Sequence, residues 1–336
     1  MNHNQNLLDA LTREGVLISV SCRYWRAAKK LQAADLGLDP DDVAERLISL
    51  GHKRLLPRDA LAAFALIESR AHALVEASTF PFLNNIARFL PNAKLAEVTR
   101  RLNELEHEFG VARADFAAQY AKLRSEAIGE WHEAASRLVN DPERVVATIN
   151  AAFPQADRLD RYFGFTVSLF QVRAPEELET ELITAGDQQG IIEARAQAAS
   201  DAKAKIAEGV ETFVGDCVAS LREQTAELCD EMLASMKGGK TGVHQRTLNR
   251  LVDFIDRFKS LNFTGDRELE ERLEAVRKQF LTRTAEEYRD SDSAKRKLDA
   301  GIRGLADEAR RLARSDASEI VERFGQIGVR KFSLAA

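Results

Sequence analysis

The chain has 336 residues, of which 45% are hydrophobic and 30% are charged, so it can bury a sizeable core and is not disordered by composition. It contains only 7 prolines and 4 tyrosines, which disfavours a large β-sandwich or barrel, because those folds need frequent turn residues and β-rich strands. The formal net charge of −5 is unevenly distributed, since residues 237–336 carry 22 basic and 17 acidic side chains and are mildly basic.

The first residues of the chain and its cysteines indicate the cellular compartment in which the protein is expected. Met1–Asn6 is polar and lacks the positive charge and apolar centre of a secretory signal. No window reaches the roughly 18 to 20 uncharged apolar residues of a membrane-spanning helix. Cys22, Cys217 and Cys229 are odd in number and far apart, which favours a reducing compartment over a disulfide framework. We therefore expect a cytoplasmic protein.

The N-terminal region is expected to combine one strand with several helices. A short helix (Leu7–Thr12) precedes a β-rich strand (Gly15–Cys22), and the pattern of Tyr24–Leu36 predicts a helix. A further helix is expected over Asp39–Gly51, and another over Pro57–Ser78, because proline and acidic residues are favoured in a first helical turn.

The segment Thr79–Pro91 is aromatic, nearly uncharged and interrupted by prolines. A buried loop or short helical turn explains this composition, and so does an exposed tip that docks on a partner or touches a membrane. We therefore take Phe80, Phe82, Ile86 and Phe89 as candidate docking residues.

Apolar residues from Leu95 to Leu138 are spaced mostly by alternating steps of three and four, which predicts a helix of about 45 residues. Its apolar seam is narrow, so it needs a partner helix. The same spacing returns from Ile206 to Met232. Both seams predict antiparallel coiled-coil packing.

A second β-rich stretch, Phe163–Val172, interrupts the helical pattern. Pairing it with Val16–Cys22 would make a small two-stranded element, which must pack on helices because two strands alone are marginal. As the second apolar segment of the chain, it adds Phe163, Phe165 and Phe170 to the docking candidates.

The C-terminal third is predicted to be almost wholly helical. Gly238 ends the preceding helix, Leu248–Leu261 is amphipathic, Asp266 begins a helix, and two more cover Ser291–Arg314 and Ser318–Phe324. With a boundary at residues 238–243, the predicted regions are 1–92, 93–237 (with the strand 163–172 inserted) and 238–336. We predict a mainly α fold, an elongated antiparallel helical coiled-coil bundle with a small two-stranded β element.

No motif predicts an enzyme, a metal site or a cofactor. Gly238–Thr241 superficially resembles a phosphate-binding loop but lacks the earlier glycine and the preceding strand of the Walker pattern. The histidines are scattered, and Cys217 and Cys229 are too far apart on one predicted helix to share a metal. We interpret these cysteines, Trp25 and Trp131 as core residues.

Two basic patterns suggest nucleic-acid binding, and each has another explanation. Arg23–Arg26 combines basic and aromatic side chains that could stack on bases, although packing of a strand–helix junction on the core is the favoured interpretation. Lys295–Lys297 and Arg310–Arg311 are bracketed by acidic residues, which favours a solvated helix surface over binding to a phosphate backbone.

Three stretches resemble blocks of a family of bacterial and phage proteins described as a domain of unknown function. They are Gly15–Leu31 (GVLISVSCRYWRAAKKL), Gly51–Pro57 (GHKRLLP) and Leu261–Asp266 (LNFTGD). The resemblance implies a gene beside those of a MoxR-type AAA+ ATPase and a von Willebrand factor A-type protein, on a phage or mobile element. None of the blocks is a catalytic motif.

We therefore expect a non-enzymatic assembly or adaptor subunit of an ATPase-dependent system, forming homo-oligomers and binding protein partners through its helical seams. One alternative is a helical membrane-active protein that converts from a soluble form, motivated by the two apolar segments. Another is nucleic-acid binding through the basic last hundred residues, with an affinity that falls steeply with salt.

Overall fold

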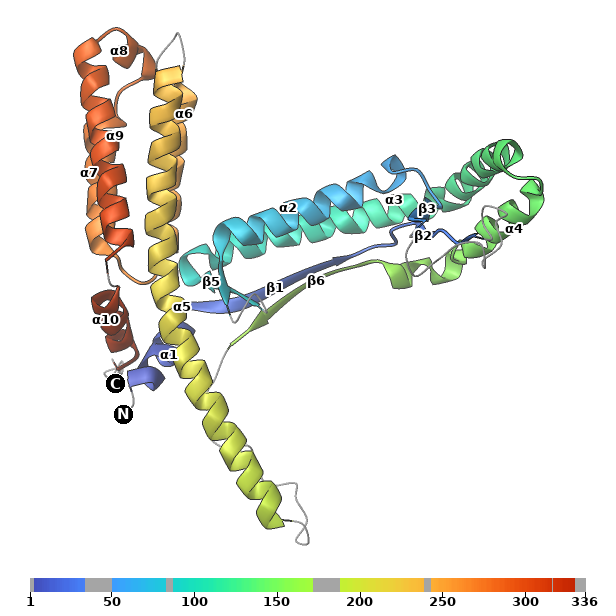
Figure 1. The fold of residues 1–336 in the computed structure, drawn as a ribbon, viewed down its shortest axis with the longest axis horizontal. Helices are drawn as coiled ribbons and strands as arrows, with labels where there is room; N and C mark the ends of the chain where they lie inside the picture. The colour runs from blue at the N-terminus through green and yellow to red at the C-terminus, as the bar shows by residue number, and fades with distance from the viewer. Residues whose placement is uncertain are drawn as a thin grey trace. The chain divides into compact units, whose positions relative to one another are not determined.

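The computed structural model describes residues 3–33, 50–82, 87–171, 188–238, 243–315 and 317–329. Over these ranges the protein is mainly α-helical with two small β-sheets (Figure 1), which confirms the prediction of a mainly α fold, whereas the elongated coiled-coil bundle stays a prediction. None of the described helices has a stretch that is both long and apolar enough to cross a membrane.

The chain divides into two compact units, and each is built from separate stretches of sequence. Unit 1 comprises residues 1–18, 78–96 and 169–336, and unit 2 comprises residues 19–77 and 97–168. This division differs from the three consecutive regions predicted, because the chain leaves unit 1 and returns to it twice. The predicted boundary at residues 238–243 lies inside unit 1.

Unit 1 is built around a long central helix, α5, which contacts α1, α6, α9 and α10. In Figure 1, α6, α7 and α9 run alongside the second half of α5. Apolar residues from all these helices form one continuous core. The helices of unit 1 are α1 (His3–Glu14), α5 (Gln188–Gly238), α6 (Gln245–Leu261), α7 (Arg267–Phe280), α8 (Ala285–Arg289), α9 (Asp292–Ala313) and α10 (Ser318–Val329).

Side-chain caps explain where the helices of unit 1 begin. The Asp266 carboxylate accepts a hydrogen bond from the Leu269 amide at the start of α7, and the Ser291 hydroxyl accepts one from the Ala294 amide at the start of α9. Both starts were predicted, whereas α8, with a capping box between Thr284 and Glu287, was not.

The segment predicted as a loop, helical turn or docking tip forms two strands instead, β4 (Phe80–Phe82) and β5 (Ala87–Pro91). They pair antiparallel with Phe80 opposite Phe89, and β5 pairs with β1 (Gly15–Arg23). The sheet order is β4-β5-β1-β6, with β6 covering Gly164–Phe170. The predicted pairing of the two β-rich stretches is therefore confirmed, but the sheet has four strands and not two. Proline is tolerated in the two additional strands, because Pro81 lies in the edge strand β4 and Pro91 is the last residue of β5.

Unit 2 contains α2 (Ala62–Ser78), most of α3 (Asn92–Leu138) and α4 (Pro142–Ala152), with short 3₁₀ turns at Asp59–Leu61 and Ala156–Tyr162. The long helix predicted from Leu95 is confirmed, and its seam is buried from Val98 to Tyr120. The seam packs on α2 through Phe64, which contacts Phe109 and Phe116 edge-on. Asp141 caps α4, because its carboxylate accepts a hydrogen bond from the Arg144 amide.

The predicted helix over Tyr24–Leu36 is wrong in its described part. Residues 24–27 have no regular structure, and Ala28–Lys30 (β2) pairs antiparallel with His52–Arg54 (β3) in a separate two-stranded sheet. Long-range strand pairing overrides a modest helix propensity here. The predicted helix over Asp39–Gly51 falls almost entirely on residues 34–49, outside the described residues.

Candidate interaction site

Two of the stretches named for the family resemblance meet in unit 2. In the two-stranded sheet, which we call the basic ribbon (Ala28–Lys30 with His52–Arg54), Lys29 lies opposite Lys53 and Lys30 lies opposite His52. Residues directly opposite in an antiparallel pair project from the same face. Every ribbon residue except Lys53 is exposed, with Lys29 on one face and Lys30 and Arg54 on the other, because successive side chains of a strand point to opposite faces.

The cations on and near the ribbon differ in whether a described acidic residue pairs with them. In the part of the chain that the structure describes, Lys29, Lys30, Arg54 and the nearby Arg58 have no ion pair. Arg26, just before the ribbon, differs because its guanidinium forms a forked pair with Glu68 at 2.7 and 3.0 Å.

An apolar groove of about 260 Å³ adjoins the ribbon. The Trp131 indole on α3 donates a hydrogen bond of 2.9 Å to the Arg54 carbonyl, which ties the helix to the end of β3. Trp131 is partly exposed and not a core residue as predicted, while Leu55 and Leu56 are buried. The groove is lined by Arg54, Leu55, Leu56, Pro57, Ala127, Glu130, Trp131 and Ala134.

A cluster of aromatic residues forms the core of unit 2. Trp25 contacts Phe116, Tyr120 and Phe153 with ring centroids 5.8 to 6.5 Å apart. Tyr24 stacks on Phe64, and both Tyr24 and Trp25 are 8% exposed. The prediction that Trp25 is a core residue is confirmed, and the alternative that these rings stack on bases is wrong, because they are covered by other side chains.

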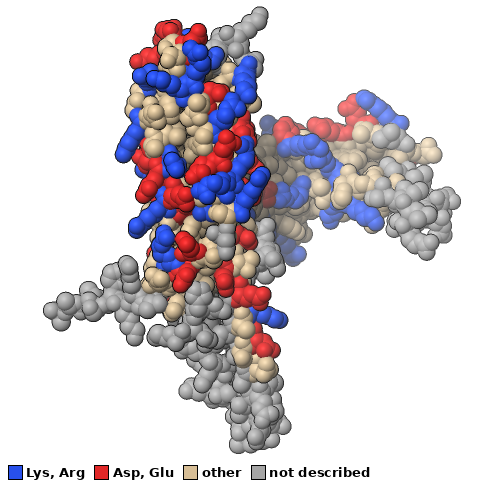
Figure 2. Space-filling view, turned by 60° about the vertical axis from the view of Figure 1, so that its left-hand side comes forward, with Lys and Arg blue, Asp and Glu red and all other residues tan. Residues whose placement is uncertain are grey.

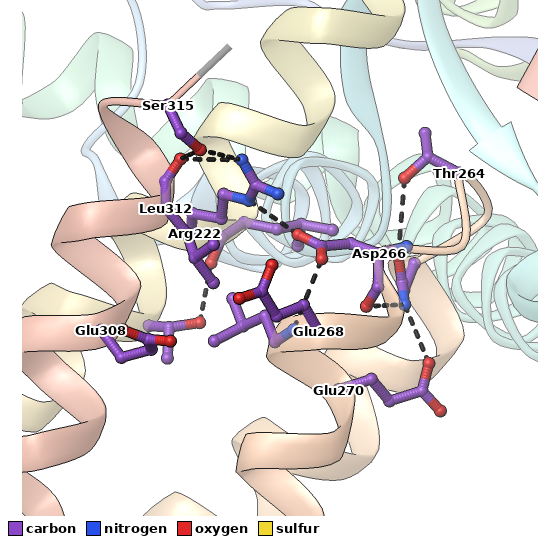
Figure 3. A network of polar contacts seen from close by, with 12 residues as sticks. Arg222, Thr264, Asp266, Glu268, Glu270, Glu308, Leu312 and Ser315 are labelled. Atoms are coloured by element: carbon purple, nitrogen blue, oxygen red, sulfur yellow. Dashed lines mark hydrogen bonds and ion pairs between the residues drawn. The ribbon is translucent and has the colours of Figure 1, made fainter. Parts of the chain in front are cut away.

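The third stretch of the resemblance, Leu261–Asp266, builds a buried polar network in unit 1 (Figure 3). The Arg222 guanidinium on α5 donates to the Asp266 carboxylate and to the Leu312 carbonyl, each at 2.7 Å, and to the Ser315 hydroxyl at 3.4 Å. Arg222 is 3% exposed and Asp266 is 2% exposed.

The remaining members of this network are also hydrogen-bonded. The Asn262 amide nitrogen donates to the Asp266 carbonyl and to the Glu270 carboxylate, and its oxygen accepts from the Asp266 amide and the Thr264 hydroxyl. The cavities described at α5 and α6, at β1 and at the basic ribbon are lined by other residues. The network holds α5, the start of α7 and the end of α9 together, and its described polar groups are engaged with one another.

The predicted docking residues are mostly buried. Phe80, Phe82, Phe89 and Phe163 are at most 4% exposed, which corrects the expectation of exposed apolar tips. The first three pack on Phe213 or Phe263, and Phe163 joins the aromatic core of unit 2. Of the other candidates, Phe165 is partly buried, Phe170 is 50% exposed, and Ile86 lies outside the described residues.

The basic C-terminal helices carry charges of both signs. Arg310 pairs with Asp230 and Asp307, and Arg311 pairs with Glu268 and Glu308. Figure 2 shows Lys and Arg interspersed with Asp and Glu over these helices. The prediction of a solvated helix surface at Arg310–Arg311 is confirmed.

The titratable residues described in the structure do not assemble a metal site, since no three His, Cys, Asp or Glu side chains converge among them.

The cysteines Cys22, Cys217 and Cys229 are buried free thiols, as predicted. Burial raises the pKa of Cys229 to about 12 and that of Cys22 to about 11, with Glu68 adding to the second shift. Protonated, covered thiols are poor nucleophiles.

The basic ribbon was missed by sequence reasoning because its two strands are separated by residues 31–51 and only pairing brings their cations together. The runs Lys29–Lys30 and Lys53–Arg54 are the signal in the sequence that could have revealed it.

A family model with the description "Protein of unknown function (DUF3150)" matches residues 12–287. Comparisons with curated proteins and with solved structures give no match.

Proposed function

Because the chain belongs to the DUF3150 family of proteins of unknown function, we propose a function from its own surface: a non-enzymatic assembly or adaptor subunit. One contrast carries this proposal. The converging buried polar groups of unit 1 are engaged with one another, whereas an apolar groove and cations with no ion pair to a described residue lie on the surface of unit 2. An unsatisfied, accessible surface suits a binding protein better than a catalyst.

The partners we propose follow from the resemblance described above. The chain would be the helical component of an assembly that contains a MoxR-type AAA+ ATPase and a von Willebrand factor A-type protein, encoded on a phage or mobile element. The first part of α5 supports self-association through an antiparallel coiled coil. Its described residues from Gln197 to Lys205 are exposed, whereas the seam is buried from Val210 onward.

Light scattering coupled to size-exclusion chromatography, with crosslinking mass spectrometry, tests this function. The full chain is measured alone and after co-expression with the ATPase and the von Willebrand factor A-type protein encoded beside it. We expect an oligomer or a mixed complex with reproducible crosslinks. A strictly monomeric chain that forms no complex contradicts the proposal.

A second candidate function is membrane activity, favoured by one observation. Leu169 and Phe170 are each 50% exposed at the end of β6, which is unusual for large apolar side chains. Flotation with liposomes of mixed neutral and anionic lipids tests it, comparing the parent with Phe170→Asp. Lipid association by the parent that the substitution abolishes supports membrane activity, and a parent that stays with the protein fraction eliminates it.

A further inference from the structure

We propose that β6 (Gly164–Phe170) binds a second copy of this chain by antiparallel strand pairing, so that the four-stranded sheets of two copies join at this edge. This inference rests on the proposed function as an assembly subunit and names a surface through which two copies meet. That surface is separate from the first part of α5, to which coiled-coil association is assigned above.

One edge of β6 is unpaired among the described strands. In the sheet order β4-β5-β1-β6, the strand has β1 as its one described neighbour, so its other edge presents backbone N–H and C=O groups that no described strand uses. None of its seven residues is fully buried, and Leu169 and Phe170 are each 50% exposed. A strand of this length and exposure can be extended by another strand.

The other described edge strands carry features that prevent edge-to-edge pairing, and β6 does not. β4 has three residues with Pro81 at its centre, and proline cannot donate to a strand ladder. β2 and β3 carry basic side chains, such as Lys29 and Arg54. The sequence of β6, GFTVSLF, contains neither a proline nor a charged residue. The free edge of β6 is therefore open to pairing.

The residue types of β6 are symmetric about Val167, which favours a second copy as the occupant. With Val167 opposite the partner's Val167, Phe165 lies opposite the partner's Leu169 and Thr166 lies opposite the partner's Ser168. An apolar pair and a hydroxyl pair are both stabilising across antiparallel strands. No like charges meet, because the strand has no charged residue. One surface is thus complementary to itself, as a twofold interface requires.

This register also matches the two strands in backbone and in faces. Residues two apart in a strand direct their N–H and C=O groups to the same edge, and pairing about Val167 always places odd-numbered residues opposite odd-numbered ones. Phe165 contacts Phe109 on α3 with ring centroids 5.9 Å apart, so the apolar face of β6 is the one that α3 covers. Across the joined edge this apolar face would continue into the second copy, where the half-exposed Leu169 gains Phe165 as a neighbour.

The strand suits another strand better than a lipid surface. Leu169 and Phe170 by themselves would suit either one. In hydrocarbon, however, the unpaired backbone groups of β6 and the exposed Thr166 hydroxyl would lose their water without gaining partners. A second strand supplies a partner to each backbone group, and the pairing closes at two copies because each β6 has one free edge.

Disulfide trapping on the full chain tests the pairing and its register. Val167→Cys places a thiol on the twofold axis, where directly opposite Cα atoms are about 4.5–5.5 Å apart, within the span of a disulfide. The matched control is Thr166→Cys, because two copies of residue 166 are offset by two residues and lie beyond about 7 Å. Copper–phenanthroline is the oxidant, and the native cysteines are buried.

Charged variants test the same contact without a covalent bond. Thr166→Lys/Ser168→Lys places lysines opposite lysines, and Thr166→Glu/Ser168→Glu places glutamates opposite glutamates. The matched control is Ser19→Lys/Ser21→Lys, which adds the same charge on exposed residues of β1, inside the sheet. Sedimentation equilibrium measures the dissociation constant of self-association for each variant and for an equal mixture of the lysine and glutamate variants. Circular dichroism spectra establish that the variants are folded.

Val167→Cys should give a covalent dimer, and Thr166→Cys should not. The lysine and glutamate variants should each raise the dissociation constant at least about tenfold, because two like-charge pairs replace two hydroxyl pairs. Their mixture should restore association to within about threefold of the parent, and the control should stay within about twofold of it.

Three outcomes overturn the inference. They are equal or absent trapping of the two cysteine variants, a lysine variant that associates as tightly as the control, and a parent that is monomeric in solution but floats with liposomes. Failure of the proposed function gives a different result. Self-association that survives the lysine variant, or a mixed complex formed by a monomeric chain, leaves the assembly role in place and removes β6 as the interface.

Discussion

Arg222 and Asp266 are opposite charges almost fully removed from solvent, 2.7 Å apart. Such a pair contributes little net stability relative to apolar residues, because the cost of desolvating both charges offsets their attraction. Removing one partner is nevertheless strongly destabilising, because the other charge is left buried and unpaired. The additional bonds to the Leu312 carbonyl and the Leu269 amide tie the pair to the ends of α9 and α7. The pair therefore specifies how these helices meet.

Asp266→Ala should lower the free energy of unfolding by about 3–5 kcal/mol, because it leaves the Arg222 guanidinium buried and unpaired and removes the cap of α7. The measurement is urea denaturation followed by circular dichroism. Arg222→Met combined with Asp266→Ala should cost less than the sum of the single substitutions. Additive costs would show that the two residues are not coupled.

The buried thiols predict a dependence on alkaline pH. The pKa of Cys229 is raised from 9.0 to about 12 and that of Cys22 to about 11, chiefly by burial. As the pH rises above 9, these thiols ionise in the unfolded chain while they stay protonated in the folded protein. Ionisation therefore stabilises the unfolded state relative to the folded state. Stability should therefore be unaffected below pH 9 and fall as the pH rises toward 11 and 12.

A thiol reagent at pH 8 checks the same environment. No cysteine should react in the native protein, and all three should react in denaturant, because the thiols are covered and protonated. Rapid native labelling of Cys229 would contradict its burial.

At the scale of elements, β4 and β5 show how apolar composition alone misleads. Phe89 is 1% exposed and contacts Phe213 and Phe263, whereas Phe170 on β6 is 50% exposed. Phe89→Ala should lower the free energy of unfolding by about 3–5 kcal/mol, because it leaves a cavity in the core. Phe170→Ala is the matched control and should change it by less than about 0.5 kcal/mol. Thermal or urea unfolding distinguishes the two, and equal effects would contradict the assignment of Phe89 to the core.

Helix α9 carries two glycines with different roles. A Cβ at Gly301 would lie 2.6 Å from Phe280 Cζ on α7, whereas one at Gly304 would meet open space. Gly301→Ala should destabilise the protein by forcing Phe280 to move, and Gly304→Ala should stabilise it by about 0.5–1 kcal/mol through helix propensity. Urea midpoints check this, and stabilisation by both would show that α7 and α9 do not approach closely at Gly301.

At the scale of the whole molecule, the two units have separate cores. Phe64 anchors the aromatic core of unit 2, and Phe258 lies in the apolar core of unit 1. Phe64→Ala should accelerate amide hydrogen exchange in α2 and in the neighbouring part of α3 while α6 and α9 stay protected. Phe258→Ala should have the converse effect. Exchange that accelerates throughout the chain in both variants would show that the units unfold together.

The features that the sequence determined by itself are those set by residues close along the chain. Asp141, Asp266 and Ser291 cap helices through hydrogen bonds to amides three residues ahead, and the seam of α3 repeats with the helical period. These signals are local, so most of the long helices and the two β-rich strands could be predicted without knowledge of the fold, whereas the five-residue helix α8 was missed.

Tertiary structure decided what depends on distant partners. Ala28–Lys30 is a strand only because His52–Arg54 pairs with it. Phe80, Phe82 and Phe89 are held in the core because β5 pairs with both β4 and β1. Arg222 on α5 pairs with Asp266 at the start of α7, and the basic ribbon forms only when β2 and β3 pair. Strand pairs and buried ion pairs are stabilised by contacts between residues that are far apart in the chain. A local pattern of residue types does not identify the distant segment that will make these contacts.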